Sequence, residues 1–65
     1  MKTFITTSDD VKAMVIAMKV AGLKVEKTNT TRKVEINGQT IFWAMKGSKK
    51  VKGTWMVRHN ENLFA

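Results

Sequence analysis

The chain has 65 residues, which is the size of a single domain. Its 12 basic and 5 acidic side chains give a formal net charge of +7, and it contains no cysteine. These counts exclude a disulfide framework and a thiolate metal site, and they favour polyanionic partners. The charge is uneven, because residues 1–22 hold three basic and two acidic side chains, whereas residues 23–65 hold nine basic and three acidic ones.

The N-terminal part predicts a strand followed by a helix. Residues 2–6, KTFIT, are rich in the β-branched and aromatic side chains that strands favour. Ser8 is the expected N-cap of the helix, and Asp9 and Asp10 would lie at the positive end of the helix dipole. The helix should end near Ala21, with Gly22 in the left-handed conformation that often follows a helix.

The predicted helix has an apolar stripe with the i, i+3, i+4, i+7 spacing of a core-facing surface. Its members are Val11, Met14, Val15 and Met18. Ile16 and Val20 fall outside this stripe, so the helix is more apolar than one sheet face requires. We expect this excess to be covered either by Leu63 and Phe64 or by a second copy of the chain, in a homodimer through the helix.

The strongest local signal is a β-hairpin. Asn37-Gly38 separates residues 32–36 from residues 39–46, and Asn and Gly tolerate the positive φ of a two-residue type I′ turn. In the register set by this turn, Ile36 pairs with Gln39 and Lys33 pairs with Phe42. The face expected to form the core then carries Val34, Ile36, Ile41, Trp43 and Met45. The face expected to stay mostly in water carries Lys33, Glu35, Thr40, Phe42 and Ala44.

Two further strands complete the predicted sheet. Residues 23–27 alternate in polarity, residues 28–31 form either a turn or a continuation of that strand, and residues 54–58 place Trp55 and Val57 on one face. With residues 28–31 counted as a continuation, the expected fold is α+β with the order β-α-β-β-β, in which one helix packs on one face of a small, mainly antiparallel sheet. Residues 1–65 would be a single basic domain, with 59–65 as a tail.

The sequence predicts a cytoplasmic protein without membrane contact. The N-terminus lacks the apolar core of a signal peptide. The most apolar window, residues 11–23, is too short to span a membrane and contains Lys12 and Lys19.

Enzymatic activity is not expected, because no catalytic constellation can be found. His59 is the only histidine, the carboxylates are scattered, and no glycine-rich phosphate-binding motif is present. We therefore expect no catalytic residue, no metal site and no cofactor.

A glycine-bracketed basic loop is the main functional signal. Lys49, Lys50 and Lys52 lie on the predicted hairpin tip, where they could contact phosphates together with Arg58. Lys33 and Phe42 would add contacts on the open sheet face, because an exposed aromatic ring beside a cation is typical of base-stacking sheets.

These features predict a non-enzymatic protein that binds DNA or RNA. The alternative is a small protein-binding module or inhibitor whose target is an acidic protein surface. In size, basic charge and lack of catalytic groups, the chain resembles small accessory proteins encoded by viruses or mobile elements.

Overall fold

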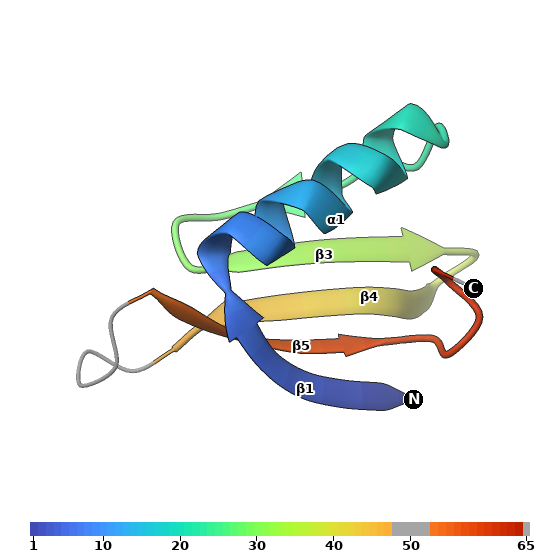
Figure 1. Ribbon diagram of the computed structural model, residues 1–65. Coiled ribbons are helices and arrows are strands. Elements are labelled where there is room, and N and C mark those ends of the chain that lie inside the picture. Colours follow the sequence, from blue (N-terminus) through green and yellow to red (C-terminus); the bar gives the residue numbers. More distant parts are fainter. Residues whose placement is uncertain (48–52, 65) are drawn as a thin grey trace.

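The computed structural model describes residues 1–47 and 53–64. Its elements are β1 (Lys2–Thr7), α1 (Ser8–Val20), β2 (Glu26–Lys27), β3 (Thr31–Ile36), β4 (Gln39–Lys46) and β5 (Thr54–His59). The strands form one antiparallel sheet with the order β1-β5-β4-β3-β2, and α1 lies on one side of it (Figure 1). The predicted α+β class, the single helix and the mainly antiparallel sheet are confirmed.

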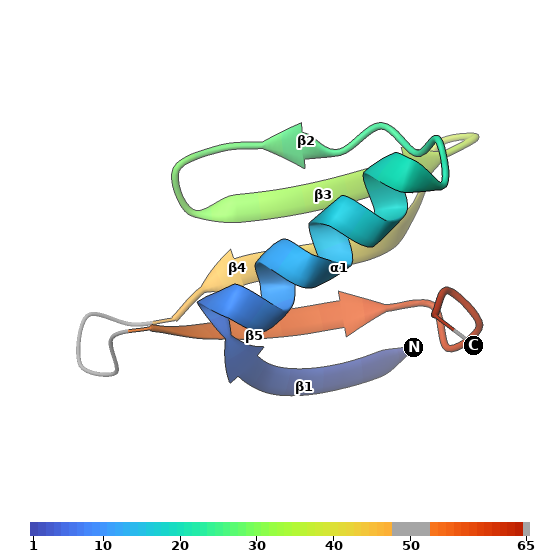
Figure 2. The ribbon, with the colours of Figure 1, turned by 45° about the horizontal axis from the view of Figure 1, so that its top comes forward.

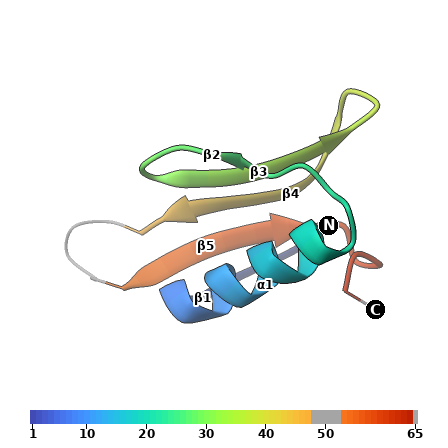
Figure 3. The same ribbon diagram turned by 90° about the horizontal axis from the view of Figure 1, so that it is seen from above.

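The first strand lies at one edge of the sheet, next to the last strand, and β2 lies at the other edge. Helix α1 connects these two edges and therefore runs diagonally over the sheet (Figure 2). It begins beside β1 and β5 and leaves β2 to one side (Figure 3). The expected meander of β3, β4 and β5 is present, with each strand paired to the next.

Residues 28–31 form a turn, which adds a short strand to the predicted order. The Thr28 N–H donates to the Thr31 carbonyl at 3.0 Å, and the two threonine hydroxyls lie 2.6 Å apart. This turn folds β2 back on β3, so that Lys27 pairs with Arg32. Strand β2 has only two residues, fewer than the predicted 23–27.

Both ends of α1 follow from local sequence. Thr7, one residue before the predicted N-cap, accepts a hydrogen bond from the Asp10 N–H at 3.2 Å. At the other end, Gly22 has a φ of 88° and its N–H donates to the Lys19 carbonyl, while the Leu23 N–H donates to Met18. These two bonds satisfy carbonyls that a helix end leaves unpaired. Among residues 1–47 and 53–64, no helix has the length and apolarity needed to cross a membrane.

The hairpin turn has the predicted conformation, with φ of 53° at Asn37 and 77° at Gly38. The predicted pairs Ile36–Gln39 and Glu35–Thr40 are present. The register then shifts, because Val34 pairs with Phe42 and Ile41 is left as the extra residue of a β-bulge.

The β-bulge reverses the predicted faces of β4. Phe42 and Ala44 are fully buried beneath α1, whereas Met45 is 37% exposed and Trp43 is only partly buried. The assignment of Trp43 and Met45 to the core was therefore wrong, as was the placement of Phe42 and Ala44 on the open face. Ile36, which was also assigned to the core, is 42% exposed at the hairpin end of β3. The core also contains Val34, Trp55 and Val57 of the sheet and Val11 and Met18 of the predicted helix stripe.

The C-terminal residues cover one end of the core. Strand β5 extends to His59, which is buried and packs edge-on against Phe4 and Phe64, with ring centroids 5.6 and 5.0 Å apart. Leu63 packs against the core as well. The tail does not cover the apolar excess of α1, because Ile16 is 54% exposed and Val20 is 83% exposed. A homodimer through these residues stays a prediction.

Candidate functional site

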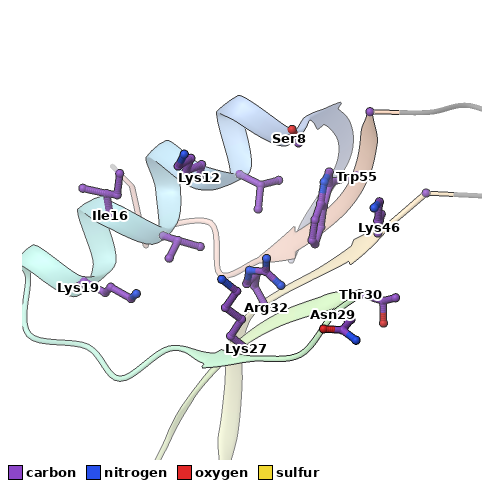
Figure 4. Close-up of a pocket in the computed structure, with 14 residues that line it drawn as sticks. Ser8, Lys12, Ile16, Lys19, Lys27, Asn29, Thr30, Arg32, Lys46 and Trp55 are labelled. Carbon is purple, nitrogen blue, oxygen red and sulfur yellow. The ribbon is translucent and has the colours of Figure 1, made fainter.

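The diagonal course of α1 leaves a groove between the helix and the β2–β4 side of the sheet (Figure 4). Its volume is about 1130 Å³. The basic side chains that line it come from four elements: Lys12 and Lys19 of α1, Lys27 of β2, Arg32 of β3 and Lys46 of β4. None of the described residues that line this basic groove is acidic.

Sheet pairing and helix periodicity bring these five side chains together. Lys27 and Arg32 are cross-strand partners and point toward α1 (Figure 4). Lys12 and Lys19 are seven residues apart, so they lie on the same side of α1. Lys46 joins the group because its N–H donates to the Thr30 carbonyl at 2.8 Å, which holds the end of β4 beside the turn.

Arg32 has the most fixed position of the five. Its Nη1 donates to the carbonyls of Thr28 and Thr31 at 2.6 and 2.8 Å. Its guanidinium lies over the ring of Trp55, 5.1 Å from the centroid, which is a cation–π arrangement. Nε and Nη2 of a guanidinium carry three further N–H donors, so Arg32 can hold an anion while it keeps these contacts.

The wall of the groove formed by α1 is apolar, because Val11, Val15 and Ile16 line it between the lysines. Positive side chains thus surround a partly apolar surface. Five cations around a groove whose described lining contains no carboxylate create a local positive potential, which attracts anions and raises their association rate.

The site residues predicted from the sequence do not all lie on the same face of the sheet in the described part of the structure. Lys33 and Arg58 lie on the open face, on the side of the sheet opposite to α1, where each is a cross-strand partner of Trp43. Phe42 is fully buried and cannot contact a ligand, because the β-bulge turns it toward the helix. Lys49, Lys50 and Lys52 lie outside the described residues.

Lys33 is paired with an acidic neighbour. Its Nζ lies 2.5 Å from Oε1 of Glu35, and both side chains are more than one-third exposed. This hydrogen bond and charge contact raise the pKa of Lys33 and lower the pKa of Glu35. Exposed pairs of this kind contribute little to stability and exchange readily with other partners.

The basic groove was missed from the sequence, although part of its signal was there. Lys12 and Lys19 have the spacing of one helix side, and a turn at residues 28–31 would place Lys27 beside Arg32. The sequence does not show that Lys12 and Lys19 lie next to Lys27 and Arg32, because this depends on the angle at which α1 crosses the sheet.

Within the part of the chain that the structure describes, no three His, Asp or Glu side chains gather in a way that could hold a metal ion. Comparison of the chain with protein-family models, with curated proteins and with solved structures gave no match.

Proposed function

We propose that this protein is a non-enzymatic nucleic-acid-binding protein whose basic groove holds the phosphate backbone. The observation that supports this proposal is the set of five cations, from four elements, around one groove whose described lining contains no carboxylate. Lysine and arginine side chains that neutralise successive phosphates supply most of the affinity of such proteins, independently of base sequence.

Three further lysines are proposed as additional phosphate contacts. Lys49, Lys50 and Lys52 belong to the segment between β4 and β5, and Gly47 and Gly53 at its two ends both line the basic groove. Arg58 and Lys33 lie on the open face, so they would meet a different part of the ligand.

A second candidate function is the binding of an acidic protein segment. The observation that favours it is the apolar wall of the groove, where Val15 and Ile16 could receive apolar side chains of an acidic amphipathic partner.

Salt-dependent binding of two charge-matched variants tests the proposal. The groove variant is Lys12→Gln with Lys27→Gln, and the control is Lys2→Gln with Lys24→Gln, which removes the same charge from exposed positions outside the groove. For the groove variant, the slope of log affinity against log salt should flatten by about 1.4 on single strands and about 1.8 on B-DNA, since each lost phosphate contact removes ~0.7 or ~0.9. Fluorescence anisotropy of labelled oligonucleotides measures both slopes.

The control variant should keep a slope close to that of the wild type. Equal loss in both variants would show that net charge, and not the groove, determines binding. The second candidate function would be favoured if the wild type bound every oligonucleotide weakly and bound an acidic peptide tightly. The variant Lys49→Gln/Lys50→Gln/Lys52→Gln extends the same measurement to the segment between β4 and β5.

A further inference from the structure

The open face of the sheet presents a second cluster of aromatic and basic side chains. Arg58 of β5, Trp43 of β4 and Lys33 of β3 are successive cross-strand partners, so their side chains emerge side by side from the same face. Trp43 is thus flanked by a cation on each side.

These three side chains line a depression of about 340 Å³, together with Met1 and Thr40. None of its described lining residues is acidic. The volume lies at the lower end of the ~300–1,000 Å³ of small-molecule sites, which suits a flat ring better than a folded protein segment. The cluster combines one large apolar ring with two positive charges.

The orientation of Trp43 depends on the β-bulge. Without the extra residue Ile41, the alternation of β4 would turn Trp43 toward α1 and Phe42 toward solvent. The bulge is held in place by the tail, because the Asn60 N–H donates to the Ile41 carbonyl at 2.8 Å. Bulges are common beside functional sites, where they redirect a side chain.

We infer that Trp43 is a stacking platform for an unpaired nucleobase, with Arg58 and Lys33 contacting the phosphates on either side of it. An aromatic ring between cations is what sheets that bind single strands use, and a base within a duplex does not offer its face in this way. The inference takes its ligand class from the proposed function, but it uses other residues, on the opposite face of the sheet. The ligand inferred for this site is single-stranded nucleic acid.

Glu35 provides an internal competitor for this site. Its carboxylate contacts the Lys33 ammonium and repels a phosphate that approaches this lysine. Removing the negative charge of Glu35 should therefore strengthen binding more than Glu61→Gln does, which removes the same charge from an exposed position outside the depression.

The test measures the affinity of an oligothymidylate and of a duplex of the same length for five variants. Trp43→Leu should weaken oligothymidylate binding by about 5- to 150-fold, the usual value of one stacked base, and Trp43→Phe should weaken it less. Glu35→Gln should bind more tightly than the wild type and than Glu61→Gln. Met56→Gln, on the same face but outside the depression, serves as the matched control and should bind like the wild type.

Tryptophan emission supplies a direct readout. Oligothymidylate should quench the wild type more than it quenches Trp43→Phe, which retains only Trp55, and the duplex should quench both weakly. Unchanged affinity of Trp43→Leu and Glu35→Gln, or equal quenching by duplex and single strand, would overturn the inference. If the groove variant still loses affinity in that case, the stacking site is refuted and the proposed function of the groove is kept. If only the Trp43 variants lose affinity, the groove is not the site.

Discussion

Phe42 and Trp43 are adjacent in the chain and lie on opposite faces of the sheet. Phe42 packs beneath α1 with no exposed surface, and its ring contacts Phe64 edge-on at 6.2 Å between centroids. Trp43 contributes less to the core because it is only partly buried. Of the two aromatic residues, Phe42 should therefore contribute more to stability.

We predict that Phe42→Ala lowers the free energy of unfolding by about 3–5 kcal/mol, since it leaves a cavity in the centre of the core. Trp43→Ala should cost clearly less, and its amide spectrum should keep native dispersion. Urea unfolding followed by circular dichroism measures both variants. A larger loss for Trp43→Ala than for Phe42→Ala would contradict the arrangement of β4.

The sequence could not reveal which of these residues is buried. Ile41, Phe42 and Trp43 form an uninterrupted apolar run, so alternation assigns β4 to either face equally well. The turn fixes the register only near itself, and a single extra residue exchanges the faces beyond it. The carbonyl of Ile41, the extra residue of the β-bulge, accepts a hydrogen bond from Asn60, which is far away in the sequence.

At the scale of the elements, the ends of α1 were predicted to within one residue. Their signals are local, since Thr7 and Gly22 act on backbone groups only a few residues away. The bounds of the two-residue strand β2 were predicted less accurately than those of α1, because its pairing depends on the turn at residues 28–31 and not on its own composition. The basic groove depends on how α1 crosses the sheet, which no short-range pattern encodes.

Gly22 gives a clean test of the helix end. Its φ of 88° is unfavourable for a residue with a Cβ, yet a Cβ added there would meet nothing within 4 Å. The expected cost of Gly22→Ala is therefore backbone strain alone, about 1–2 kcal/mol. Gly22→Asn should cost less, because Asn adopts the left-handed conformation more readily. Thermal unfolding of both variants measures the difference, and equal stability of Gly22→Ala and the wild type would refute this explanation.

At the scale of the whole molecule, the tail is part of the fold. Asn60 holds the β-bulge, Leu63 packs against the core, and Phe64 lies against His59 and Phe42. Its apolar side chains therefore support the buried core, and its backbone, through the Asn60 N–H, supports the β-bulge that orients Trp43.

Deleting residues 60–65 should lower the free energy of unfolding by about 2–4 kcal/mol, from the loss of the Leu63 and Phe64 side-chain contacts and of the hydrogen bond between Asn60 and Ile41. A domain of this size has only ~3–10 kcal/mol in total. Thermal unfolding should therefore move to clearly lower temperature, and an unchanged transition would contradict the role of the tail.

Sedimentation across a dilution series tests the homodimer expected through Ile16 and Val20, and a constant monomer mass would exclude it.

The pairing of β1 with β5 has a consequence for how the chain acquires its structure. Lys2 is the ladder partner of His59, and Thr7 is the ladder partner of Thr54, so β1 has no neighbour until β5 has been synthesised. Helix α1 likewise lacks Trp55 and Val57 beneath it until then. A nascent chain that ends before β5 can form the β3–β4 hairpin but lacks part of the surface that buries α1. Native structure should consequently arise late in synthesis and in one step, with the closing of this long-range ladder setting the rate.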